Sequence, residues 1–226
     1  MIWDVRTNTA DMGGNRVKQY TLLHTQPEAL ASGEIWTRAP KLEIGCYPWD
    51  ETGYRPPASA QMVWTQDRLA VRYETAERAI RAEARGICPV VCDDSAVELF
   101  LMPEPAEGGR YLNFEINTLC AMYLGAGTCR EDNVLQTQED LLQFAARSEL
   151  CLVPEGYRWR VTFEIPLAYL RRHAGCGELH AGKRMRANFY KIAEKGPCPH
   201  CGCWNPIVWE EPDFHRPEFF GDLCLG

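Results

Sequence analysis

The segment that most constrains the fold runs from 157 to 166 and reads YRWRVTFEIP, with apolar and polar residues alternating almost without a break. A period of two places successive side chains on opposite faces of a β-strand, so one face of this segment is apolar and the other polar. The same alternation recurs at 97–101, 111–117 and 186–192. An apolar strand face must be covered by a second layer, which predicts an all-β fold.

Many short strands separated by turns predict a single β-sandwich, jelly-roll-like or immunoglobulin-like, over the whole chain 1–226. The segment 61–73 predicts a hairpin. Helical spacing at 76–85, 138–148 and 167–173 predicts two or three short helices, although the first of these segments is alternatively an irregular surface excursion. We expect one core made of these inward residues: Val97, Leu99, Leu101, Phe114, Ile116, Val161, Phe163, Ile165, Ala187 and Phe189.

The net charge of −7 over 226 residues restricts the partners of this chain. An acidic protein repels nucleic acid, anionic membrane surfaces and phosphate-rich ligands, so neutral or cationic partners remain. No stretch reaches the roughly 20 apolar residues that a membrane helix needs, and residues 1–14 do not have the pattern of a signal peptide. Without an export signal, we expect the eleven cysteines to be reduced thiols in a cytoplasm rather than a disulfide framework.

Aromatic residues gather in the C-terminal segment 204–223, between prolines and beside an acidic run. Rings next to arginine, histidine and carboxylates in a proline-interrupted segment favour a recognition surface. The alternative is that the rings close one end of the sandwich core, because large aromatic side chains are usually buried. The sequence leaves both interpretations open.

Several motifs in a fixed order resemble the family 9 carbohydrate-binding modules of the DOMON-type sandwich superfamily, and stand-alone bacterial proteins of that kind in particular. The motifs are DDSAVELFL, YLNFEIN, VTFEIPLAYL, RANFYKI, the W-x-P at 204–206 and FHRPEFFGDL. Upstream, GEIWTRAP and MVWTQDRLAVRYE are similar to the first strand and hairpin of the family. The resemblance runs from about Ile35 to Leu223.

The resemblance implies a two-sheet sandwich that binds a sugar on one face or edge without catalysis. Family members clamp a terminal sugar between two tryptophan rings. One ring corresponds to Phe214, flanked by His215 and Arg216, and the other falls near 90–92, where this chain has no aromatic residue. The implied polar contacts are Asn113, Glu115, Asn188 and Tyr190, with Trp204 and Trp209 as further stacking candidates.

The chemistry of these residues suits a sugar. An aromatic ring can pack on the C–H face of a pyranose, while amides, carboxylates and guanidinium groups bind its hydroxyls. Strand alternation also directs Asn113, Glu115, Asn188 and Tyr190 away from the core. The alternative is a solvated sheet face held by cross-strand pairs.

The sequence also contains two candidate metal sites. Cys198, Cys201 and Cys203, with His200 between them, resemble half of a zinc ribbon. No second cysteine pair has the spacing that would complete a ribbon, so plain loop thiols are the alternative. Asp93 and Asp94 are a candidate for calcium. No cofactor is otherwise indicated.

Two other functions stay open on the same fold. The first is a glycosidase that uses two carboxylates about 5–10 Å apart, for which the candidates are Asp93, Asp94, Glu98, Glu115 and Glu164. The second is a haem carrier, for which Met122 and His215 are the candidate axial ligands. The sequence shows no nucleophile elbow, zinc-protease motif or phosphate-binding glycine loop.

Overall fold

The structure is a computed structural model that describes residues 17–105 and 109–226. Residues 1–16, in which we expected no export signal, lie outside the described part. No helix in the described ranges is long and apolar enough to cross a membrane. None of the eleven cysteines forms a disulfide.

The described residues form thirteen strands in one sheet. The strands are β1 (Gln19–His24), β2 (Leu42–Glu43), β3 (Ala58–Trp64), β4 (Arg68–Glu77), β5 (Ala96–Met102), β6 (Tyr111–Asn117), β7 (Met122–Gly127), β8 (Val134–Leu135), β9 (Arg147–Val153), β10 (Gly156–Pro166), β11 (Arg184–Ala193), β12 (His200–Cys203) and β13 (Gly221–Leu225). The helices are α1 (Pro27–Ser32) and α2 (Leu167–Ala174), with 3-10 turns η1 (Glu34–Thr37), η2 (Val91–Asp93), η3 (Leu141–Phe144) and η4 (Pro217–Phe219).

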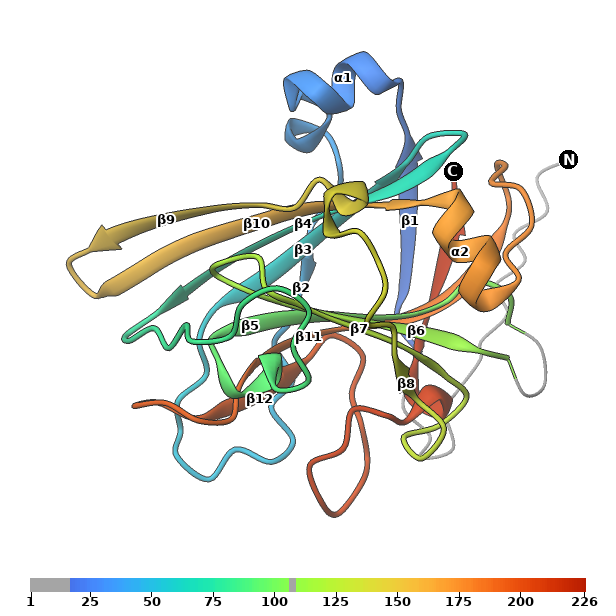
Figure 1. The fold of residues 1–226 in the computed structure, drawn as a ribbon. Helices are drawn as coiled ribbons and strands as arrows, with labels where there is room; N and C mark the ends of the chain where they lie inside the picture. Colours follow the sequence, from blue (N-terminus) through green and yellow to red (C-terminus); the bar gives the residue numbers. More distant parts are fainter. Residues whose placement is uncertain (1–16, 106–108) are drawn as a thin grey trace, which may run out of the picture.

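The sheet runs in the order β8-β7-β6-β5-β11-β13-β1-β3-β4-β10-β9, with β12 beside β11 and β2 beside β3. Strand β1 joins the two halves, because it pairs in parallel with β13 through residues 19–22 and with β3 through residues 23–24. The sheet curls at this junction, so that β5, β6 and β11 lie opposite β3, β4 and β10 (Figure 1). The two layers of the predicted sandwich are therefore the two halves of one continuous mixed sheet.

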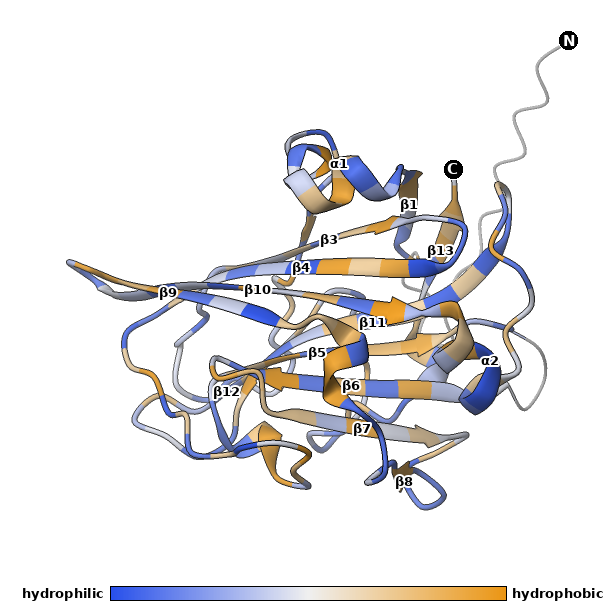
Figure 2. Cartoon of the chain, turned by 45° about the horizontal axis from the view of Figure 1, so that its top comes forward, coloured by the Kyte–Doolittle hydropathy of each residue, from blue (hydrophilic) through white to orange (hydrophobic). Residues whose placement is uncertain are grey.

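The core lies between these halves and confirms the inward-facing set predicted from alternation: all ten of those side chains belong to one buried cluster. Phe163 of β10 packs against Phe114 of β6 with ring centroids 6.1 Å apart, which connects the two layers. Apolar and polar residues alternate along β6 and β10 (Figure 2). The hairpin β3–β4 and the helix α2 are also confirmed.

Other local predictions differ from the structure. The 138–148 pattern predicts a helix, but only the four residues of η3 are helical and β9 begins at Arg147. Of the two alternatives for 76–85, the irregular excursion is correct, because β4 extends to Glu77 and the chain then follows no regular element. Helix α1 was not predicted, since its six residues are too few for a helical period to be recognised.

Candidate functional site

On β5, β6 and β11, one sheet face carries Glu98, Asn113, Glu115, Asn188 and Tyr190 and lies opposite the core, as alternation predicts, but this face is not solvated. The turn η2 and the segment 203–220 cover it and bury a second apolar cluster against it. The polar groups of this face are therefore enclosed between the sheet and the covering segments.

A pocket of about 80 Å³ remains under this cover. The strand register fixes the order in which the pocket residues lie across the sheet. Glu98 of β5 lies directly opposite Glu115 of β6, and Tyr190 of β11 lies opposite Glu98 on the other side. The pocket is lined by Trp49, Cys92, Glu98, Phe100, Glu115, Arg130, Ile192, Glu194, Cys201, Pro212, Asp213, Phe214 and His215.

Two buried carboxyl groups on neighbouring strands line this pocket. The side chains of Glu98 and Glu115 are 2% and 7% exposed. Asn113 Nδ2 donates a hydrogen bond to Oε1 of Glu115 at 3.1 Å, whereas Oε2 has no partner. Burial raises the pKa of Glu115 to about 7 and, together with the neighbouring Glu115, raises that of Glu98 well above its ordinary value. Both pKa values are raised because too few cationic or hydrogen-bond-donating groups stabilise the ionised carboxylates in this pocket.

Aromatic rings form one wall of the pocket. Phe214 stacks on Tyr190 with centroids 4.0 Å apart, and Trp49 lies 5.9 Å away on a tilted plane. Trp49 Nε1 donates a hydrogen bond to the carbonyl of Trp209 at 2.9 Å, which fixes its loop to the covering segment. The ring beside Phe214 therefore comes from Trp49, in the loop before β3, and not from 90–92, where the family resemblance implied a second ring.

His215 and Arg130 border the same wall. Tyr111 Oη and His215 Nδ1 are 2.6 Å apart, and burial lowers the pKa of His215 to about 4, so the imidazole is neutral at neutral pH. Arg130 donates to Oδ1 of Asp213 at 2.7 Å. The guanidinium is more than half exposed and lies at the pocket, so its remaining donors can turn to a ligand.

The structure does not bring all the predicted contacts into the pocket. Asn188 is fully buried, donates to the carbonyl of Asn205 and accepts from the backbone N–H groups of Phe189 and Asn205. Trp204 packs edge-on against Phe189 in the main core.

Arg216 and Trp209 of the covering segment pack against each other rather than into the pocket. The Arg216 guanidinium lies 3.5 Å from the centroid of the Trp209 ring and pairs with Asp213 at 2.8 Å. Neither residue lines the pocket, and Asn113 and Tyr190 reach it only through Glu115 and Phe214.

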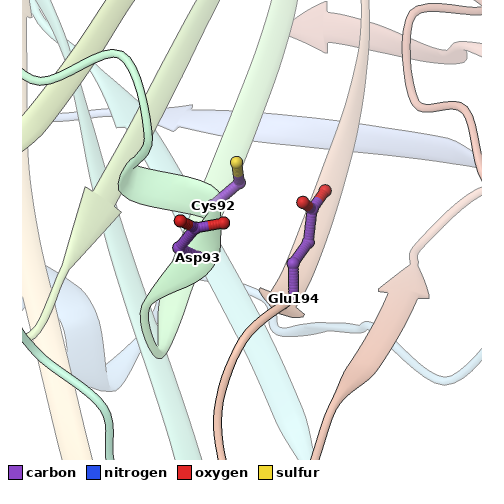
Figure 3. A group of neighbouring side chains, drawn as sticks. All are labelled: Cys92, Asp93 and Glu194. Carbon is purple, nitrogen blue, oxygen red and sulfur yellow. The ribbon is translucent and has the colours of Figure 1, made fainter.

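The candidate metal residues are arranged differently from the sequence-based expectation. Strand β12 extends the segment 200–203, and the thiols of Cys198, Cys201 and Cys203 do not converge on one point. The carboxylate of Asp94 accepts hydrogen bonds from Arg81, Asn117 and two backbone N–H groups, so its oxygens are not available to calcium. Instead, Cys92, Asp93 and Glu194 bring one ligand atom each within 4.8 Å of one another (Figure 3).

The haem candidates lie on opposite faces of the sheet. Met122 belongs to the main core, whereas His215 lies on the covered outer face. The geometry does not form an axial pair from these two residues.

Sequence reasoning missed Trp49, Arg130 and Glu194 as pocket residues. Each comes from a different loop, and no local pattern relates them. The sequence did contain one hint of this site: Trp49 is a tryptophan in the proline-containing loop 47–57 rather than in a strand.

A larger hollow of about 410 Å³ lies on the outer face of β3, β4, β9 and β10. Three of its charged side chains pair with one another, since Arg160 contacts both Glu74 at 2.7 Å and Glu149 at 3.1 Å. Trp159 reaches it only at its edge, because that ring is buried in the core. The hollow offers no exposed ring face, and the unpartnered buried atom in its lining is the neutral hydroxyl oxygen of Thr75 rather than a carboxylate oxygen, so we assign the functional site to the smaller pocket.

Known proteins agree with this architecture. The sequence pattern of carbohydrate-binding family 9 matches residues 24–225. The chain belongs to carbohydrate-binding family 9. No curated protein matches it.

Solved structures similar to this chain include a Bacteroides uniformis protein to which carbohydrate binding is ascribed. It has a TM-score of 0.79, 29% sequence identity, and coverage of 93% of this chain and 100% of its own. A family 9 module from Caldicellulosiruptor kristjanssonii in complex with glucose has a TM-score of 0.62 and 15% identity, covering 92% and 96% of the two chains. The same organism's module in complex with cellotriose has a TM-score of 0.57 and 16% identity, covering 92% and 93%. At 15% and 16% identity, the two Caldicellulosiruptor modules show that the fold is shared.

Proposed function

We propose that the protein binds the terminal unit of a neutral sugar or oligosaccharide in the pocket between Trp49, Phe214 and the Glu98–Glu115 pair. The observation that carries this proposal is the combination of an aromatic wall with a buried carboxyl oxygen that lacks a partner. Membership of a carbohydrate-binding family and similarity to modules in complex with glucose and cellotriose support it.

The pocket groups suit hydroxyl recognition. A neutral or ionised carboxyl group accepts from a sugar hydroxyl, and a guanidinium donates to one. Glu115 Oε2 and the exposed donors of Arg130 would bind neighbouring hydroxyls, while Phe214 or Trp49 packs on the C–H face. The neutral imidazole of His215 adds a polar group without adding charge.

The ring spacing limits how the sugar enters. Carbon atoms in contact are about 3.5–4.0 Å apart, so a pyranose between two rings needs about 7–8 Å between them. The Trp49 and Phe214 centroids are 5.9 Å apart, and the pocket of about 80 Å³ is smaller than the roughly 300 Å³ of an ordinary ligand site. A clamped sugar must therefore displace the Trp49 loop, which lowers the affinity to about the millimolar to high-micromolar range, or about −4 to −6 kcal/mol.

One observation favours a second candidate function, hydrolysis of a glycosidic bond. Directly opposite residues on adjacent antiparallel strands have Cβ atoms about 4.5–5.5 Å apart, and retaining glycosidases use carboxyl groups about 5–5.5 Å apart. Glu98 and Glu115 lie directly opposite each other in register, so their Cβ atoms have this spacing and both carboxyl groups line the pocket. The pair is deeply buried, however, and binding without turnover accounts for its environment equally well.

A glycan array followed by calorimetric titration of glucose, cellobiose and cellotriose tests the proposal. We expect binding without release of shorter products, and a loss of about fivefold to 150-fold in affinity for Phe214→Ala and Trp49→Ala, because removal of one stacked ring costs about 1–3 kcal/mol. Product release would favour the glycosidase.

The matched control is Tyr157→Ala, which removes a half-buried ring of the β9–β10 hairpin that does not line the pocket. This variant should bind like the parent. If Phe214→Ala and Trp49→Ala also bind like the parent while they remain folded, the sugar site lies elsewhere.

A further inference from the structure

Two cysteines that do not line the sugar pocket lie face to face beside it. Cys46 and Cys203 are directly opposite each other in an antiparallel bridge, and each backbone N–H donates to the carbonyl of the other, at 3.1 and 2.7 Å. Residues that exchange both hydrogen bonds have Cα atoms about 5.5 Å apart. A disulfide spans Cα separations of about 4.4–6.8 Å. The backbone of this pair therefore already has the spacing that a disulfide needs.

The side chains of the pair share one environment. Cys203 is a buried member of the apolar cluster under the covering segment, and the partly exposed Cys46 packs against the same cluster. The other strand cysteines of the described chain, Cys151, Cys201 and Cys224, each stand opposite a residue of another type. The sheet register therefore aligns one pair of cysteines within the described residues.

The two thiols differ in reactivity. A hydrogen bond from the Cys203 thiol lowers the pKa of Cys46 to about 7 against the effect of burial, and the charges of Lys18 and Arg55 act in the same direction. The same hydrogen bond, together with burial, raises the pKa of Cys203 well above its ordinary value. Because the thiolate is the nucleophile, Cys46 is suited to attack and Cys203 to resolve the product.

We propose that Cys46 and Cys203 are a reversible redox couple whose disulfide ties the Trp49 loop, residues 44–57 between β2 and β3, to β12. The Cys46 thiolate attacks one sulfur of a small disulfide such as oxidised glutathione and expels one thiolate. Cys203 then attacks the Cys46 sulfur of the mixed disulfide, and the second thiolate leaves with the proton of Cys203. The cysteine pair loses two electrons, which reduce the small disulfide to two thiols.

The place of Cys46 in its loop gives the disulfide a consequence for the pocket. Trp49 follows in the same loop and contacts Phe214. Tyr47 Oη donates to the carbonyl of Pro56 at 2.5 Å, which connects the two ends of the loop. A tie at Cys46 restrains the loop that a clamped sugar has to displace. The oxidised protein should therefore bind cellotriose more weakly, by about fivefold or more, an expectation that rests on the proposed function.

Mapping of disulfides in the full chain tests the couple. The protein is treated with excess oxidised glutathione, its remaining thiols are blocked with N-ethylmaleimide, and a non-reduced tryptic digest is analysed by mass spectrometry. We expect a link between Cys46 and Cys203 that dithiothreitol reverses, with fragmentation distinguishing Cys203 from Cys198 and Cys201 in the same peptide. The matched variants Cys151→Ser and Cys198→Ser should keep the link, whereas Cys46→Ser should abolish it.

Amide hydrogen exchange and cellotriose titration of the reduced and oxidised forms test the tie. Exchange in residues 46–55 should slow on oxidation of the parent, and oxidant should change neither exchange nor affinity in Cys46→Ser. A link from Cys46 to Cys198 or Cys201, a lasting mixed disulfide with glutathione, unchanged exchange, or equal affinity of the two forms would each overturn the proposal. If neither form binds cellotriose, the proposed function fails, while the mapping and the exchange still decide whether the couple ties the loop.

Discussion

The two faces of β5 and β11 both bury charge, but they handle it in opposite ways. On the core face, Lys191 and Glu77 form an ion pair at 3.1 Å in which both side chains are almost completely buried. Lys191 also donates to the carbonyls of Ala96 and Ile192, and Glu77 accepts from Trp159 Nε1 at 2.7 Å and Ser95 Oγ at 2.9 Å. Every strong donor of the ammonium group has a partner.

On the outer face, two carboxyl groups, Glu98 and Glu115, are buried opposite each other with no cationic partner among the described residues, and one oxygen of Glu115 is unpartnered. A buried charge that is fully paired holds a fold together, whereas a buried carboxylate oxygen that lacks a partner beside an aromatic wall is available to a ligand. Neutral buried atoms without a partner, such as Thr75 Oγ1 and Tyr169 Oη, also occur elsewhere, so the contrast rests on the carboxyl pair rather than on any single unpartnered atom.

The largest expected effect is on the paired face. Glu77→Ala leaves the Lys191 ammonium group buried without its counter-ion and should lower the free energy of unfolding by about 3–5 kcal/mol. Urea unfolding measures this change. Phe163→Ala, an apolar truncation in the same core, should cost a similar 3–5 kcal/mol and sets the scale. A loss below about 1 kcal/mol for Glu77→Ala would show that the ion pair is not structural.

A smaller effect of opposite sign is expected on the unpaired face. Glu115→Gln keeps the shape and the acceptor for Asn113 but removes a buried, unpaired charge, so at pH 8 in the presence of a chelator it should stabilise the fold by about 1–2 kcal/mol. The comparison with wild type in the same urea series measures it. A destabilisation as large as that of Glu77→Ala would mean that the two faces do not differ.

The smallest effect is a pH dependence that arises on the paired face. Burial, and then the charge of Lys191, lower the pKa of His200 to about 4, while its Nδ1–H donates to the carbonyl of Cys198. Glu77 lies 3.8 Å from its Nε2, and the ring of Tyr54 packs edge-on against it.

Between pH about 6.5 and 4 the unfolded chain binds a proton at this histidine and the folded chain does not. Stability is therefore present above pH 6.5 and is lost as the pH falls, by about 1 kcal/mol at pH 5.5. The difference in unfolding free energy between wild type and His200→Gln, measured at pH 7.5 and 5.5, isolates this contribution from the other titrating groups. An unchanged difference would contradict the low pKa.

The sequence predicted what depends on local alternation. Trp159, Phe163 and Phe189 face the core as expected, because a period of two fixes the face of a strand once its register is set. It could not predict that the polar face of β5, β6 and β11 is covered, because the cover is a distant proline-interrupted segment without a period of its own. The same limit applies to Trp49, Arg130 and Glu194, which only the three-dimensional structure brings to one pocket.

The central claim, that the small unpaired pocket rather than the larger paired hollow binds the sugar, is tested most directly by NMR. Backbone amide shifts of the labelled protein would be followed while cellotriose is added. The account predicts that shift changes concentrate at Glu98, Glu115, Arg130 and 213–215, with the Trp49 loop moving as the rings separate. Changes that instead concentrate around Ser59, Glu74 and Arg160, with the pocket residues unmoved, would contradict it.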